Sequence, residues 1–174
     1  MKFGVFGTGS VGKTIASRLV SLGHQVKMGS RTAGGDKALA WVADAGQLAS
    51  EGTFSDAAQF GEILFNCTSG MGSISALSMA GAENLDGKIL IDLANPLDFS
   101  RGMPPSLSVC NISSLGEQIQ EGFPGLKVVK TLNTMWAGLM VNPGLVNDGD
   151  HSVFICGNDP SAKERVKKDV LVAF

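Results

Sequence analysis

The chain has 174 residues, which is enough for one domain of ordinary size with its own apolar core. Hydrophobic residues make up 44% and charged residues 17%, a composition that excludes a disordered or fibrous chain. The formal net charge is −2 and no basic stripe is present, so neither a nucleic acid nor an anionic membrane surface is expected as a partner.

Apolar runs alternate along the chain with stretches of helical periodicity. The expected elements are, in order, a strand at 2–6, a helix at 11–22, a strand at 25–29, a helix at 35–45, a brief strand at 53–54, a helical connection at 56–61, a strand at 62–67, a helix at 71–80, a strand at 88–93, a loop at 95–105, a helix at 114–121, a strand at 127–131, a strand at 152–156 and a helix at 161–172. This alternation predicts an α/β fold of Rossmann type, with a doubly wound, mostly parallel sheet and helices on both faces.

A single domain over residues 1–174 is expected, and its last helix runs into Phe174 without a stop signal. We therefore hypothesise that a short C-terminal segment is missing. No apolar stretch reaches membrane-spanning length and the N-terminus is not a signal peptide, so we expect a cytoplasmic protein. The three cysteines, Cys67, Cys110 and Cys156, are expected to be unpaired and buried. No metal site is expected, because no cluster of ligand residues has suitable spacing.

A glycine-rich turn follows the first strand. Residues 7–14 read Gly-Thr-Gly-Ser-Val-Gly-Lys-Thr, which satisfies both the dinucleotide pattern G-x-G-x-x-G and the triphosphate pattern G-x-x-x-x-G-K-[ST]. Asp92, at the end of a later strand, resembles the acidic residue that holds magnesium in the second class. Both patterns bind phosphate with backbone amides at a helix N-terminus, so the turn alone does not separate them.

The end of the next strand separates the two patterns. It reads Gly29-Ser30-Arg31-Thr32, at the place where NAD-binding Rossmann proteins carry an acidic residue for the ribose 2′-hydroxyl. Two hydroxyls and a guanidinium offer donors for a 2′-phosphate instead, and arginine binds phosphate through two parallel hydrogen bonds. The strand end favours NADP as the cofactor and leaves a triphosphate-binding protein as the weaker alternative.

Polar residues also follow three later strands, at the edge where open parallel sheets bind their ligands. The three runs are Asn66-Cys67-Thr68-Ser69-Gly70, Asp92-Leu93-Ala94-Asn95-Pro96 and Thr131-Leu132-Asn133-Thr134-Met135-Trp136. The chain has no tyrosine, which excludes a short-chain dehydrogenase with its Tyr–Lys pair. Hydride transfer between two cofactors needs little acid–base help, so no catalytic residue is predicted.

Four pieces of the sequence, residues 1–12, 29–32, 92–96 and 131–135, together resemble the NADP oxidoreductases that depend on the deazaflavin coenzyme F420. The resemblance implies reversible hydride transfer between C4 of nicotinamide and C5 of the deazaflavin. The cofactor would then lie along the following residues: Gly7, Thr8, Gly9, Ser10, Val11, Gly12, Ser30, Arg31, Thr32, Thr68, Ser69, Asn95 and Pro96. The substrate side would be bordered by Asn133, Met135 and Trp136, with the apolar region 135–145 as a floor for a flat ring.

The partner of the cofactor stays open at this point. It is expected to be a small-molecule hydride donor or acceptor: coenzyme F420, a flavin or a small carbonyl compound. An imine or β-hydroxyacid reductase would need an acid such as a lysine on a helix after the 127–131 strand, where none is found. A non-catalytic NADP-sensing module is the alternative of another class. A homodimer is a further hypothesis, because a lone Rossmann domain leaves its substrate side open.

Overall fold

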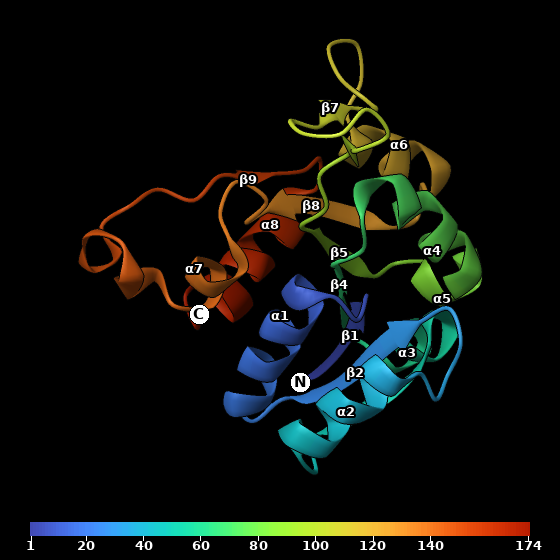
Figure 1. Ribbon diagram of the computed structural model, residues 1–174, viewed down its shortest axis with the longest axis vertical. Coiled ribbons are helices and arrows are strands. Elements are labelled where there is room, and N and C mark those ends of the chain that lie inside the picture. Colours follow the sequence, from blue (N-terminus) through green and yellow to red (C-terminus); the bar gives the residue numbers. More distant parts are fainter.

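The computed structural model describes residues 1–174, which are built around a seven-stranded sheet (Figure 1). The strand order is β3-β2-β1-β4-β5-β8-β9, with the bounds β1 (Lys2–Phe6), β2 (Gln25–Ser30), β3 (Ala49–Thr53), β4 (Ile63–Asn66), β5 (Ile89–Asp92), β8 (Lys127–Thr131) and β9 (Ile155–Cys156). Neighbouring strands are parallel except β8 and β9, which pair antiparallel. The expected Rossmann-type fold with a mostly parallel sheet is confirmed.

Helices cover both faces of this sheet (Figure 1). One face carries α1 (Ser10–Ser21), α2 (Asp36–Ala45), α7 (Ala137–Val141) and α8 (Pro160–Val166). The other face carries α3 (Phe54–Phe60), α4 (Ser73–Ala80), α5 (Ala82–Leu85) and α6 (Leu115–Gly122). Shorter turns are η1 (Gly70–Gly72), η2 (Pro143–Leu145), η3 (Asn147–Gly149) and the wider η4 (Lys167–Leu171).

The central strands are apolar on both sides because both faces of the sheet are buried. In β1, Phe3 and Val5 pack into the core beneath α1, whereas Phe6 packs into the core beneath α3 and α4. A Cβ on Gly4 would lie 2.4 Å from the carbonyl oxygen of Ala57, so the backbone of α3 packs directly on this strand. The strand register places the ends of β1, β4 and β5 level with one another, since Phe6 pairs with Asn66 and Asn66 with Asp92.

The brief strand expected at 53–54 is wrong. The edge strand β3 is Ala49–Thr53, and Phe54 is the first residue of α3. Thr53 caps that helix: its Oγ1 accepts a hydrogen bond from Asp56 N at 3.1 Å, and Asp56 Oδ2 accepts one from Thr53 N at 2.8 Å. The β3 residues include Ala, Ser, Glu and Gly, which have low strand propensity, so pairing with β2 decides their conformation.

The C-terminal third also differs from expectation. The strand expected at 152–156 is reduced to β9, and the helix expected at 161–172 is α8 followed by the wider turn η4. The loop at 95–105 contains the start of a small hairpin, β6 (Leu97–Asp98) with β7 (Ser106–Leu107). Helices α5 and α7 are too short, at four and five residues, to show helical periodicity in the sequence.

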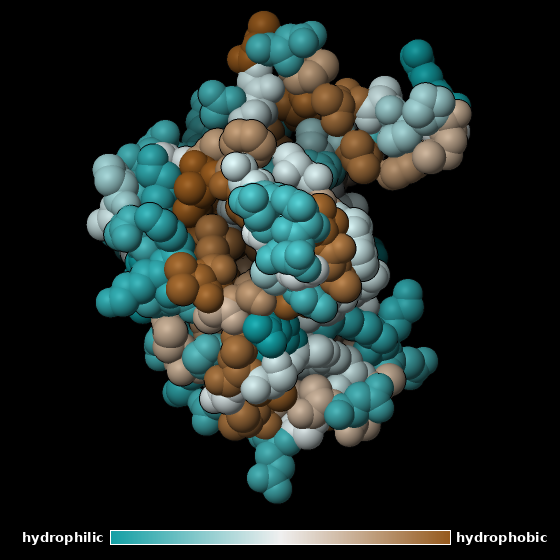
Figure 2. Space-filling view, turned by 90° about the vertical axis from the view of Figure 1, so that its left-hand side faces the viewer, coloured by the Kyte–Doolittle hydropathy of each residue, from teal (hydrophilic) through white to brown (hydrophobic).

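Two segments project from the body of the fold in Figure 1: the one that carries β6 and β7, and residues 142–154 between α7 and β9. Figure 2 shows hydrophobic surface on both sides of a hydrophilic protrusion in the centre of the face it displays. Exposed apolar side chains on the two segments include Phe99, Met103, Ile112, Leu145, Val146 and Phe154. No helix of the protein is both long enough and apolar enough to span a membrane.

The three cysteines are unpaired, as expected, but their burial differs from expectation. Cys67 is half-buried, whereas Cys110 and Cys156 are exposed. Cys156 lies on the outermost strand of the sheet and Cys110 follows the projecting hairpin, so neither has a layer of side chains above it.

Candidate functional site

The glycine turn joins β1 to α1 and is held by close backbone contacts. Gly7 has φ +114°, and a Cβ on it would lie 2.7 Å from the carbonyl oxygen of Cys67. A Cβ on Gly12 would lie 2.1 Å from the carbonyl oxygen of Gly7. Only glycine satisfies both positions, because the first needs a left-handed backbone and the second lets the helix pack against the turn.

Gly9 differs from these two glycines. Its φ of −77° suits any residue, and apart from Gly9 and its chain neighbours nothing lies within 4 Å of the place where its Cβ would be. The helix α1 that starts there has no side-chain cap and no acidic residue in its first turn. The N–H groups of Ser10, Val11 and Gly12 precede the first intrahelical bond, from Lys13 N to Gly9 O. The open space and the free amides fit a diphosphate.

The start of α1 at Ser10 also distinguishes the two phosphate patterns. In the triphosphate pattern the residues before Gly-Lys-Thr form the loop, but here two of them, Ser10 and Val11, already belong to helix α1. Lys13 lines a surface hollow with Asn142 and Phe174, along the side of the helix. Asp92 is fully buried and paired with Lys130, so its carboxylate is already engaged. The geometry supports the dinucleotide turn.

The loop after β2 is shaped by its own hydrogen bonds. Ser30 Oγ donates to the carbonyl oxygen of Thr32 at 2.7 Å, and Gly34 N donates to Glu51 Oε2 at 3.0 Å. Arg31 is exposed and forms no hydrogen bond or ion pair with the rest of the chain. Its guanidinium is free for a ligand beside the carboxyl end of the strand.

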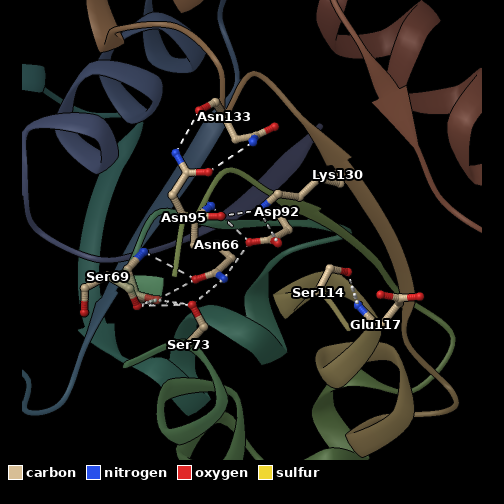
Figure 3. Close-up of polar contacts among 11 residues, drawn as sticks. Asn66, Ser69, Ser73, Asp92, Asn95, Ser114, Glu117, Lys130 and Asn133 are labelled. Atoms are coloured by element: carbon tan, nitrogen blue, oxygen red, sulfur yellow. Dashed lines mark hydrogen bonds and ion pairs between the residues drawn. The ribbon is translucent and has the colours of Figure 1, made fainter. Parts of the chain in front are cut away.

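A row of polar side chains crosses the sheet at the same edge. Asn66 of β4, Asp92 of β5 and Lys130 of β8 are register partners, and Asn66 and Asp92 are fully buried. Asn66 Nδ2 donates to Asp92 Oδ1 at 2.8 Å, and Lys130 Nζ donates to Asp92 Oδ2 at 2.8 Å (Figure 3). Each buried polar side chain in the row therefore has hydrogen-bond partners, which a charged group needs when it is buried.

This row holds the loop after β4. Asn66 Oδ1 accepts hydrogen bonds from Thr68 Oγ1 at 2.7 Å and Thr68 N at 3.3 Å. The buried Ser73 Oγ accepts from Asn66 Nδ2 at 2.9 Å and donates to the carbonyl oxygen of Ser69 at 3.2 Å. The backbone of Thr68 and Ser69 is therefore fixed next to the glycine turn, where a Cβ on Gly7 would lie 3.3 Å from Thr68 N.

The ends of β5 and β8 are joined by two amide side chains. Asn95 Nδ2 donates to the carbonyl oxygen of Asn133 at 2.8 Å, and Asn133 Nδ2 donates back to Asn95 Oδ1 at 3.1 Å (Figure 3). Leu132, the residue before, is buried with φ +61°, a conformation that a side chain of this size rarely adopts. A strained residue beside a polar bridge of this kind is typical of a functional site.

A cavity of about 730 Å³ opens next to this bridge. Its lining residues come from the loop after β5, helix α6 and strands β8 and β9: Asn95, Pro96, Leu107, Val109, Cys110, Asn111, Ser113, Ser114, Leu115, Gly116, Glu117, Gln120, Val128, Lys130, Asn133, Cys156, Gly157 and Asn158. In Figure 3, Ser114 and Glu117 at the start of α6 lie below Lys130, whereas Asn95 and Asn133 lie on the other side of Asp92. The size suits a small-molecule ligand.

The structure brings some of the expected residues together and separates others. Asn95, Pro96 and Asn133 meet at the cavity. Met135 is half-buried against the core, and Trp136 is 61% exposed with its ring against Gly138, so neither lines the cavity. Met140, part of the expected apolar floor, is buried in the core beneath α1.

Sequence reasoning missed Lys130 and Ser73, although the polar ends of neighbouring strands are visible in the sequence. Strand register was the missing information, since it alone shows that Lys130 lies beside Asp92.

Burial raises the pKa of the Cys67 thiol, and the nearby charge of Asp92 raises it further. The thiol is therefore protonated at neutral pH and is a poor nucleophile. Cys67 serves the site through its backbone, which packs against Gly7.

A family model described as NADP oxidoreductase, coenzyme F420-dependent, matches residues 2–96, more than half of the chain. The chain belongs to this family. The match covers the glycine turn, the end of β2 and the polar residues after β4 and β5. It confirms the resemblance drawn from the strand ends and places the chain among NADP-dependent oxidoreductases.

Individual relatives agree with this membership. A solved structure from Arthrobacter sp. FB24, provisionally described as an F420-dependent NADP-reductase, is 50% identical, covers 99% of this chain and 80% of that chain, and has a TM-score of 0.93. The rat metalloreductase STEAP3 is 33% identical over 96% of this chain, which spans only 31% of STEAP3. Plasmodium falciparum pyrroline carboxylate reductase, solved with NADP bound, is 18% identical, covers 99% of this chain and 55% of that chain, and has a TM-score of 0.61; this likeness shows the fold alone.

Proposed function

We propose that this protein is an NADP(H)-dependent oxidoreductase that transfers a hydride between C4 of nicotinamide and a flavin-like acceptor, including the deazaflavin coenzyme F420. The observation that carries the proposal is the open phosphate site at Gly9 and α1, combined with the unpaired Arg31 one strand away. Family membership supports the reaction class.

The sheet order supports an extended cofactor lying across the strand ends. Parallel strands are about 4.8 Å apart, so the ends of β2, β1, β4 and β5 span roughly 14 Å in that sequence. Arg31 at β2 would hold the 2′-phosphate, with Ser30 and Thr32 beside it. The amides at Gly9 would hold the diphosphate, and the nicotinamide would lie near Asn95.

The remaining proposed contacts follow the same path. Thr8, Ser10 and Val11 would line the diphosphate, and Thr68 and Ser69 would lie along the cofactor. Bound there, NADPH supplies a hydride from C4 of its nicotinamide. The fixed loop after β4 would orient the ring, and the Asn95–Asn133 bridge would keep it in place.

The acceptor would bind in the cavity between Pro96 and α6, because this cavity adjoins the proposed nicotinamide position. Asn133 lines this cavity and would border the acceptor. In this arrangement the protein would act mainly by holding two rings in contact and excluding water.

The cofactor proposal is tested by Arg31→Ala. Loss of one charge-assisted phosphate contact should weaken NADPH binding by about 1–3 kcal/mol and leave NADH binding almost unchanged, as measured by nicotinamide fluorescence titration. The matched control is Arg101→Ala, since Arg101 is another exposed arginine without a partner and lies outside the proposed cofactor path. Equal weakening of NADPH and NADH by the Arg31 variant would show that this residue does not contact the 2′-phosphate.

The reaction is tested by following NADPH oxidation at ~340 nm with the deazaflavin, FMN or FAD as acceptor. Turnover with one of these is expected. NADPH binding without turnover on any of them would refute the oxidoreductase proposal in its flavin-like form and would favour an NADP-sensing module.

A further inference from the structure

The cavity beside the Asn95–Asn133 bridge carries very few charges. Among its 18 lining residues Lys130 is the single cation and Glu117 the single carboxylate. The apolar side chains of Leu107, Val109 and Leu115 and several uncharged amides make up much of the remainder. Several negative charges would find one positive partner here, so the lining favours the uncharged or singly charged ring part of an acceptor, with any acidic tail outside the cavity.

Lys130 is held in place on the wall of this cavity. Its Nζ donates to Asp92 Oδ2 at 2.8 Å and to the carbonyl oxygen of Ala94, and Asp92 is itself fixed by Asn66 Nδ2 at 2.8 Å and Ala94 N at 3.1 Å. The lysine side chain is 23% exposed, whereas that of Asp92 is fully buried. An ammonium group has three N–H donors, and the protein uses two of them. The third remains for a ligand.

We infer that Lys130 is a catalytic residue that stabilises negative charge on the acceptor, and that the acceptor is a planar conjugated carbonyl compound bound in this cavity. The inference rests on the proposed hydride transfer. The carbonyl oxygen of the acceptor lies at Lys130, and its ring lies against Leu107, Val109 and Leu115.

The electron balance explains why a cation is needed there. An electrophilic carbon of the conjugated system gains the hydride, which forms a new C–H bond as the C4–H bond of the bound cofactor breaks. The electron pair displaced from the acceptor's double bonds moves to its carbonyl oxygen, which becomes negatively charged. Lys130 donates a hydrogen bond to this oxygen until water supplies the proton. A hydrogen-bond donor placed where negative charge develops in the transition state raises the rate of hydride transfer and leaves the affinity for the cofactor unchanged.

The test uses a double variant, Lys130→Met with Asp92→Asn, because Lys130→Met alone would leave a buried carboxylate unpaired. Asn66 Nδ2 and Ala94 N both donate to Asp92 Oδ1, and an asparagine retains that oxygen. The matched control is Lys127→Met on the same strand, since Lys127 pairs with Asp159 on the surface and does not line the cavity.

The first measurement does not depend on turnover. With NADP+ present, 4-nitrophenol is titrated by absorbance as a probe whose ionised oxygen represents the negatively charged acceptor. In the wild type and in Lys127→Met its bound form should ionise with an apparent pKa at least about one unit lower than in the double variant. The same apparent pKa in all three proteins, or no binding of the probe, would overturn the inference.

The second measurement is steady-state turnover with an acceptor that the wild type reduces. The double variant should lose about 100-fold in kcat while its Kd for NADPH stays within about twofold. Unchanged kcat, or a loss explained by weaker NADPH binding, would contradict a catalytic role. If the wild type turns over no acceptor, the proposed function fails, and the nitrophenol titration still decides whether Lys130 stabilises an oxyanion.

Discussion

Replacement by alanine should affect different properties at two glycines of the same turn. Gly12→Ala should lower the stability of the fold, whereas Gly9→Ala should weaken NADPH binding. In Gly12→Ala the new Cβ would lie 2.1 Å from the carbonyl oxygen of Gly7, which is less than a van der Waals contact. Gly7 has little freedom to move away, because its backbone packs closely against Cys67: a Cβ built on Gly7 would lie 2.7 Å from the carbonyl oxygen of Cys67. In Gly9→Ala the new Cβ meets nothing within 4 Å.

The magnitudes follow from these contacts. Overpacking of this severity costs about 1–3 kcal/mol, and a domain of this size loses roughly 2–4 °C in Tm per kcal/mol, so Gly12→Ala should unfold several degrees lower. Gly9 is the N-cap of α1 with φ −77°, so its replacement by alanine should cost less than about 1 kcal/mol. The Cβ would however occupy the space proposed for the diphosphate, and NADPH binding should weaken at least tenfold, equivalent to about 1.4 kcal/mol.

The assay is a pair of measurements on each purified variant: thermal unfolding by circular dichroism and NADPH affinity by fluorescence titration. Gly9→Ala should be nearly as stable as the wild type and bind poorly. The reasoning would be refuted if Gly9→Ala bound NADPH as tightly as the wild type, since the open space would then not be the diphosphate site. It would also be refuted if Gly12→Ala unfolded at the wild-type temperature.

Three further predictions concern the cysteines and the oligomeric state. Because burial of the Cys67 thiol raises its pKa, iodoacetamide should modify the exposed Cys110 and Cys156 faster than Cys67 in the folded protein, as read by peptide mass; equal labelling rates for all three would contradict the raised pKa. The raised pKa exists only in the folded state, so the Cys67 contribution to stability should fall as pH rises past the ordinary thiol value of about 8.5, measured by urea unfolding. The homodimer stays a prediction: light scattering should give the mass of two copies, and Phe154→Ser should shift it towards one copy if the exposed side chain lies in the interface, whereas a wild-type mass of one copy would refute it.

Much of the cofactor region could be predicted from sequence because it depends on local patterns. The strand β1 was predicted with its observed bounds, and α1 within a residue at each end, since five apolar-rich residues, a glycine turn and a 3.6-residue period occur in succession. The lack of an acidic residue after β2 is equally local, and it favoured NADP before any geometry was known.

The position of the cavity could not be predicted in the same way, and the substrate-side role of Asn133, Met135 and Trp136 stays a prediction. Met135 and Trp136 have the apolar character expected of a ring-binding floor, yet Met135 packs against the core and Trp136 rests on Gly138. The cavity instead lies on the opposite side of the sheet edge, against α6, whose short amphipathic sequence gives no sign of a ligand. Whether an apolar side chain faces a core or a cavity depends on which layer covers it, and local sequence does not contain that information.

The sequence by itself determined the fold class and the glycine turn after the first strand, because periodicity and the glycine pattern are set by neighbours a few residues apart. Only the tertiary structure decided that residues 66, 92 and 130, far apart in the chain, form one row. The physical reason is strand register: parallel pairing brings Asn66, Asp92 and Lys130 side by side, and a shift of one residue would turn their side chains to the other face of the sheet. That pairing makes a strand lysine the single cation among the residues that line the cavity beside α6.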